Sequence, residues 1–210
     1  VMSWGAGNLG PRTVESLILE FGRSSLPASD VVQDIAQALF GFLSPLYTAQ
    51  FGSFPPDNQP VMGFFLGGYS ANALLAEEWQ FVVPADAAVQ QVRPAERFGA
   101  SWRGIDRPFS RLFFGVDPEI KRRLLAGGVP QKLVDGVFNR KMWTMPVMLD
   151  SMPIQDAINF AEYILRTTIG AAEFEPGPPS CGGPLQVALI RPDTGFQWVA
   201  LPELHLRGGG

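Results

Sequence analysis

Residues 5–21 read "GAGNLGPRTVESLILEF", and this stretch decides how the first part of the chain folds. Three glycines in six residues predict a tight turn, because glycine adopts backbone conformations that other residues avoid. Pro11 is suited to the first turn of a helix, and apolar residues follow it at helical spacing: Val14, Leu17, Ile18 and Phe21. The apolar residues before the turn predict a strand. The expected order is therefore strand, glycine turn, helix.

Outward from this stretch, runs of helices alternate with runs of strands. We expect a second helix from about Ser29 to Leu46, then strands at residues 61–66, 79–83 and 89–92. Helices are expected at residues 107–115, 118–126, 130–140 and 153–169, followed by a hairpin of strands at 185–190 and 196–201. Such segregation favours separate α and β layers. We expect one domain over residues 1–201 and a flexible tail at 202–210.

The last predicted helix has the clearest apolar face. Ile154, Ile158, Ile164 and Leu165 recur on one side of it, so we expect this side to pack against a sheet.

Composition excludes several classes of protein. The 210 residues carry a net charge of −4, which gives no electrostatic reason to bind nucleic acid or an anionic membrane. The longest strongly apolar run, Val61–Leu66, is too short to cross a bilayer. One cysteine and one histidine cannot build a typical zinc site, and we expect no cofactor. A single cysteine favours a reducing, cytoplasmic setting.

Four stretches resemble, in chain order, the β-type subunits of proteasomes and their bacterial proteasome-like relatives. They are "GAGNLGPRTVESLILEF", "PVMGFFLGGY", "FGASWRGIDRPFSRLFFGVDP" and "MPIQDAINFAEYILRTTIG" with the following "PPSCGGPLQVALI". The resemblance implies an α+β fold, the four-layer αββα sandwich of the N-terminal-nucleophile (Ntn) hydrolases. Because Val1 stands inside a strand pattern, we expect the N-terminal strands of that fold to be missing from this chain.

The resemblance also implies a threonine-type peptidase acting on peptides or proteins as a homo-oligomeric ring, with any ATPase partner left open. In that family an N-terminal threonine hydroxyl attacks the peptide carbonyl, and the threonine's own amine acts as the base. The chain has six threonines, and none stands at its amino terminus. We therefore expect the chain as it stands to be inactive, with its nucleophile ahead of Val1.

Five positions match the family's site. Gly7 matches the glycine whose amide holds the oxyanion, and without the resemblance it would be an ordinary turn glycine. Gly5 and Leu9 would line the substrate pocket and favour apolar side chains. Ser101, or Ala100 in the neighbouring register, matches a serine near the nucleophile's amine; a serine that only caps a loop is an equal alternative.

Cys181 allows three interpretations. A small buried apolar residue ranks first. A supporting role ranks second, because Cys181 matches the serine of the family's "S-G-G" turn, and an independent nucleophile ranks last, because the sole histidine, His205, lies in the glycine-ended tail. Pro178 stands where the resemblance implies an acidic residue, which weakens the expectation of standard threonine-protease chemistry.

Two other functions stay open. One is a catalytically silent structural or assembly subunit of a proteasome-like ring, and the other is a small-molecule binding domain unrelated to proteolysis. The resemblance also implies that Gly7, Ser101 and Cys181 converge on one cleft, although they are far apart in the sequence.

Overall fold

The chain folds into two compact units. The computed structural model describes residues 1–94, 96–138, 143–178 and 180–200. The sheet unit comprises residues 1–104 and 189–197, and the helical unit comprises residues 105–188 with the residues after 197. The predicted tail at 202–210 lies outside the described residues.

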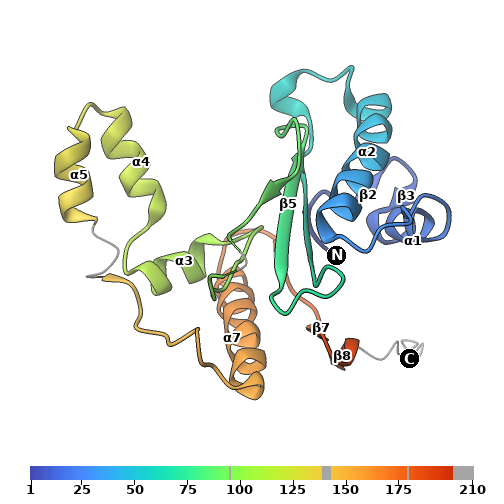
Figure 1. Ribbon diagram of the computed structural model, residues 1–210. Helices are drawn as coiled ribbons and strands as arrows, with labels where there is room; N and C mark the ends of the chain where they lie inside the picture. Colours follow the sequence, from blue (N-terminus) through green and yellow to red (C-terminus); the bar gives the residue numbers. More distant parts are fainter. Residues whose placement is uncertain (95, 139–142, 179, 201–210) are drawn as a thin grey trace, which may run out of the picture. The chain divides into compact units, whose positions relative to one another are not determined.

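A four-stranded antiparallel sheet is the frame of the sheet unit (Figure 1). In spatial order its strands are β1 (Met2–Gly5), β4 (Met62–Gly68), β5 (Glu77–Val83) and β6 (Gln90–Gln91). In the register, Phe64 of β4 lies opposite Ser3 of β1 and opposite Phe81 of β5. The first five residues of β4 are all buried, so the strand predicted from its continuous apolar run is confirmed.

The first helix, α1 (Val14–Ser24), begins later than Pro11 predicts. The residues between the turn and the helix form a small antiparallel hairpin of β2 (Asn8–Leu9) and β3 (Arg12–Thr13). Thr13 then caps the helix, because its hydroxyl oxygen accepts a hydrogen bond from the Ser16 amide at 3.1 Å. Pro11 therefore belongs to the hairpin turn.

The second helix, α2 (Val32–Phe51), takes its cap from a distant segment. The helix was predicted to start near Ser29, but the Ser29 hydroxyl oxygen accepts a hydrogen bond from the amide of Val31, the residue before the helix. The Val32 amide donates instead to the Ser70 hydroxyl at 3.1 Å. Ser70 lies in the loop between β4 and β5, a neighbour that only the folded chain reveals. A short 3-10 helix, η1 (Pro56–Asn58), follows α2.

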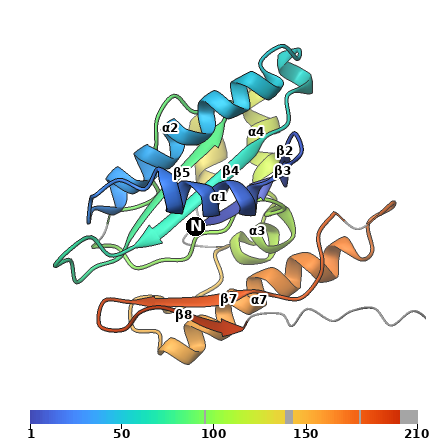
Figure 2. The same cartoon turned by 90° about the vertical axis from the view of Figure 1, so that its right-hand side faces the viewer.

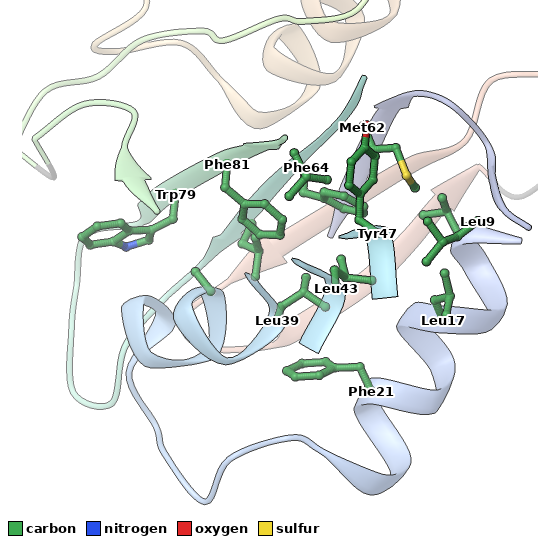
Figure 3. Close-up of a cluster of buried hydrophobic side chains, with 14 of the residues drawn as sticks. Leu9, Leu17, Phe21, Leu39, Leu43, Tyr47, Met62, Phe64, Trp79 and Phe81 are labelled. Carbon is green, nitrogen blue, oxygen red and sulfur yellow. The ribbon is translucent and has the colours of Figure 1, made fainter. Parts of the chain in front are cut away.

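Both helices cover the same face of the sheet, which we call the helix face (Figure 2). The buried side chains between these helices and the sheet form the core of the sheet unit (Figure 3). At its centre the rings of Phe64 and Phe81 stack with centroids 4.9 Å apart, and Phe40 of α2 meets Phe81 edge-on. Other core side chains are Leu17, Phe21, Leu39, Leu43, Tyr47, Met62 and Trp79.

The predicted four-layer αββα sandwich is wrong. In the described residues only one sheet has more than two strands, and helices lie on one of its faces. On the opposite face, which we call the second face, β5 presents Glu78 and Gln80, and the loop residues Ser101 and Arg103 bond to them. A second sheet would need an apolar surface there to pack against. In the described residues, Glu78 and Gln80 of β5 bond instead to a loop of the same unit.

The helical unit contains four described helices. They are α3 (Arg107–Phe114), α4 (Pro118–Ala126), α5 (Gln131–Val137) and α7 (Ile154–Ala172). All four were predicted within a few residues, and the predicted residues 139 and 140 of α5 lie outside the described part. α7 continues through Gly170, where the sequence predicted its end.

The burial predicted for one face of α7 is seen only in part. The helix contacts α3 through aromatic rings, with Phe109 of α3 meeting Phe160 and Tyr163 edge-on at centroid distances of 6.0 and 5.9 Å. Of the face expected to be buried, Ile164 is buried, whereas Ile154 and Leu165 are 48% and 44% exposed. The aromatic stripe of the helix therefore contacts α3, whereas the aliphatic face, on which Ile158 is half-buried, is covered only in part.

The predicted C-terminal hairpin is confirmed. Its strands β7 (Val187–Arg191) and β8 (Gly195–Ala200) form a two-stranded sheet. Gly195, with a φ of +70°, begins the second strand after the "PDT" turn.

Candidate functional site

The glycine turn after β1 is the first part of the candidate site. Gly5 ends the strand with a φ of +85°, in the left-handed region that favours glycine. A Cβ atom at Gly5 would lie 2.1 Å from the carbonyl oxygen of Val61, and the next amide, that of Ala6, donates to that same oxygen at 2.9 Å. Backbone conformation and space both require glycine at this position.

Gly7 lies two residues on and is exposed. Its carbonyl accepts a hydrogen bond from the Val14 amide at 2.9 Å, which ties the turn to the start of α1. A Cβ atom built on Gly7 would meet nothing within 4 Å. There is thus open space on the side of Gly7 where a side chain would lie. The oxyanion role itself stays a prediction.

Leu9 was assigned to the substrate pocket together with Gly5. The structure places its side chain in the core of the sheet unit, 6% exposed, near Leu17 (Figure 3). Leu9 therefore contributes to packing, and Gly5 contributes no side chain at all. Their effect on substrate choice stays a prediction.

Ser101 lies in a polar cluster on the second face. Its hydroxyl donates to a Glu78 carboxylate oxygen at 2.8 Å and accepts from the Arg93 guanidinium at 2.9 Å. Arg93 also forms an ion pair with Glu78, and both side chains are about a quarter exposed, at 24% and 29%. The cluster anchors the loop before α3 to β5. This geometry is that of a loop-holding serine, one of the two alternatives that the sequence left open.

A layer of aromatic and cationic groups, which the sequence analysis did not predict, lies beside this cluster. The Arg103 guanidinium lies 5.0 Å from the centre of the Phe65 ring and donates through Nε to the Gln80 side-chain oxygen at 3.1 Å. The Trp4 ring meets Phe65 at 5.3 Å and covers Gly63, where a Cβ atom would lie 2.0 Å from it. The alternation of polar and apolar residues in β5 was the signal that could have revealed a second, polar face.

Cys181 belongs to the helical unit, whereas Gly7 and Ser101 belong to the sheet unit. Its thiol is free and half-buried. The predicted convergence of the three residues on one cleft therefore stays a prediction. His205, the base that a cysteine nucleophile would need, lies outside the described residues.

A buried carboxylate with two arginine partners lies in the helical unit. Asp117 is 5% exposed and caps α4 by accepting from the Glu119 amide at 2.9 Å. The Nε atoms of Arg107 and Arg111, both on α3, donate to its second oxygen at 2.7 Å. The amide first, and the two arginines after it, lower the pKa of Asp117 to about 2. The carboxylate thereby fixes α4 to α3, a contact that the sequence analysis did not predict.

The described residues contain no group of three or more His, Cys, Asp or Glu side chains that could hold a metal ion. None of their helices is both long and apolar enough to span a bilayer.

We compared the chain with protein-family models, with curated proteins and with solved structures. None of these comparisons gives a match. Function must therefore be argued from the residues and their geometry.

Proposed function

We propose that the chain is a subunit of a bacterial, cytoplasmic, proteasome-like threonine-type peptidase that works as a homo-oligomer. The observation that carries the proposal is the turn after β1. Gly5 is required by conformation and space, and it leads directly to an exposed Gly7 with open space around it. The proposal rests on this turn and on the four sequence stretches, and it needs no four-layer sandwich.

In the proposed reaction, the turn after β1 stabilises the oxyanion. The hydroxyl of an N-terminal threonine attacks the peptide carbonyl, its proton passes to the threonine amine, and the Gly7 amide stabilises the oxyanion that forms. The tetrahedral intermediate collapses to an acyl-enzyme ester, and the C-terminal fragment of the peptide takes up the proton and leaves as a free amine. Water then hydrolyses the ester and releases the N-terminal fragment. The six threonines of the chain are internal, so the proposal requires a mature subunit that presents another threonine at its amino terminus.

The experiment measures hydrolysis of a fluorogenic peptide with an apolar side chain. It compares the 210-residue chain with a form that carries any residues encoded ahead of Val1. We expect the longer form to cleave the peptide, to present an N-terminal threonine by mass spectrometry, and to lose activity when that threonine becomes alanine. The 210-residue chain should be inactive. Activity in the 210-residue chain, abolished by Cys181→Ala, would instead make Cys181 the nucleophile.

A catalytically silent structural subunit is the second candidate, and the Ser101 geometry favours it. The Ser101 hydroxyl accepts from Arg93 and donates its one hydrogen to Glu78. That hydrogen is therefore not available for a hydrogen bond to a nucleophile's amine. The absence of an acidic residue at Pro178 points the same way. A longer form that assembles into an oligomer yet cleaves no peptide would establish this second candidate and refute the first.

A further inference from the structure

The segment that contains α3, α4 and α5 is basic, although the chain as a whole is acidic. Residues 105–138 carry six Lys and Arg against four Asp and Glu, which gives this segment a net charge of +2. The whole chain has a net charge of −4, so the remaining residues together carry −6. Charges of one sign that gather in one part of a protein attract ligands of the opposite sign. These three helices are therefore the part of the chain that attracts anions.

Two arginines of this segment are held side by side by one oxygen atom. The Asp117 Oδ2 atom lies 2.7 Å from both Nε and Nη2 of Arg107, and 2.7 and 2.5 Å from Nε and Nη2 of Arg111. The two arginines are four residues apart on α3, so they lie on the same side of the helix. The buried carboxylate therefore fixes the position and the orientation of two planar guanidinium groups before any ligand binds.

Asp117 cannot accept all the hydrogen bonds that the two arginines offer. Each guanidinium has about five N–H donors and a carboxylate has about four acceptor positions, one of which is taken by the Glu119 amide. Within the part of the chain that the structure describes, neither guanidinium bonds an acceptor other than Asp117. The Arg107 and Arg111 side chains are 59% and 53% exposed, whereas the Asp117 side chain is 4% exposed. Unused donors of both arginines are therefore open to solvent, above the charge that holds them.

The cluster has an excess of positive charge. The lowered pKa of Asp117, about 2, keeps its carboxylate ionised at neutral pH, so two guanidinium groups share one negative charge. The neighbouring acid of α4, Glu119, is paired with two other arginines of that helix. One positive charge of the cluster is therefore left without a partner in the described residues.

We propose that Arg107 and Arg111 form a binding site for a phosphoryl group, carried by a small phosphate compound or by a phosphorylated peptide. A phosphate monoester has a charge of about −1.5 to −2 at pH 7 and three acceptor oxygens, so it can accept from both guanidinium groups at once. A carboxylate offers two oxygens and a single charge, and it matches the pair less well. This inference does not depend on the proposed peptidase function, because the two arginines belong to the helical unit and the glycine turn to the sheet unit.

The first test follows the arginine Nε–Hε signals of the 210-residue chain by NMR while inorganic phosphate is added at constant ionic strength. We expect saturable shifts at Arg107 and Arg111 and none at Arg166, an exposed arginine of α7 that pairs with Glu162. A second titration uses a peptide with one phosphoserine, and the unphosphorylated peptide is its control. Tighter binding of the phosphopeptide than of phosphate would identify a phosphorylated protein as the source of the group, and equal affinities would identify a small phosphate compound.

The second test compares variants by their dissociation constants for phosphate. Arg107→Gln leaves Asp117 paired with Arg111 and removes one guanidinium, so the dissociation constant should rise about tenfold. Arg107→Lys keeps the charge but loses the planar fork, and it should recover part of the affinity. Arg166→Gln is the matched control, because it removes the same charge from another exposed helix position of the same unit. This variant should bind phosphate as the wild type does.

Three results would overturn the proposal. The first is the absence of saturable shifts at Arg107 and Arg111 in the wild type. The second is unchanged phosphate binding in folded Arg107→Gln, and the third is an equal loss of binding in Arg107→Gln and Arg166→Gln, which would reflect net charge alone. Circular dichroism verifies that each variant is folded, and the wild-type titration decides the question if Arg107→Gln does not fold. No peptidase assay enters the test, so its failure leaves the proposed function untouched.

Discussion

The sheet unit and the helical unit bury their apolar residues to very different degrees. In the sheet unit, fifteen buried side chains from α1, α2 and the strands form one continuous core. In the helical unit, the buried contacts centre on the aromatic cluster of Phe109, Phe113 and Phe160, while Phe174 is 88% exposed. Apolar area removed from water is the main stabilising term in folding, so the two units should differ in stability.

The difference also teaches what holds each unit together. The sheet unit depends mainly on apolar packing between its helices and its sheet. The helical unit relies on one buried carboxylate, Asp117, to join α3 and α4. The joint between α3 and α4 therefore depends on the charge of one carboxylate.

Removing one buried aromatic ring from either unit should cause the largest loss of unfolding free energy. Phe64 and Phe109 are both fully buried, and replacing either with alanine should cost about 3–5 kcal/mol of unfolding free energy in its own unit. Hydrogen exchange followed by mass spectrometry should show Phe64→Ala lowering protection in β4, β5 and α2, and Phe109→Ala in α3 and α7. Equal loss of protection across the whole chain from either variant would show that the two units unfold as one.

Gly5→Ala should cause the next largest loss of unfolding free energy. The new Cβ atom would clash with the Val61 carbonyl, and a positive φ strains any residue other than glycine, so we expect a loss of about 3 kcal/mol. Gly7→Ala is the matched control two residues away, where a Cβ atom has open space, and it should change the unfolding free energy by less than about 0.5 kcal/mol. Denaturant unfolding measures both. Equal effects of the two changes would contradict the structure of this turn.

Acid should act selectively on the helical unit. The folded-state pKa of Asp117 is lowered to about 2, below that of an unfolded aspartate near 3.9, so its stabilisation is complete at neutral pH. It is lost as the pH falls from about 4 towards about 2. Asp117→Asn should therefore destabilise α3 and α4 at pH 6 and much less near pH 2. The control Asp57→Asn lies in η1 of the sheet unit. An Asp117→Asn effect of equal size at both pH values would refute this role.

Ser101→Ala should cause the smallest loss of unfolding free energy. The Arg93–Glu78 ion pair remains and water can reach both groups, so the loss should be about 1 kcal/mol. We expect faster amide exchange in the loop at residues 98–104 and little change in the core. If the loop keeps its full protection, Ser101 does not anchor it.

The sequence predicted the elements of this fold better than their packing. Apolar periodicity located β4, β5, α3 and α7 within a few residues, because it depends on local geometry. It could not show that Ser70 caps α2, or that α7 contacts α3 through Phe160, because these contacts join segments distant in the chain.

The same limit applies to the candidate site. The glycine turn was recognisable because Gly5 meets a purely local demand of the backbone. Ser101 was recognised without its partners, since Glu78 lies 23 residues before it in the chain. The polar face of β5 was the one available signal against a second packed sheet, and the resemblance to the sandwich family outweighed it.

The most direct test of the account is the hydrolysis rate of an apolar fluorogenic peptide by Gly7 variants of the peptide-cleaving longer form. Gly7→Ala keeps the amide and has room for its methyl group, so it should retain most of the rate. Gly7→Pro removes the amide donor and should lower kcat about 100-fold or more, with the protein still folded by circular dichroism. Equal rates for the folded alanine and proline variants would show that the Gly7 amide holds no oxyanion, and would contradict the proposed site.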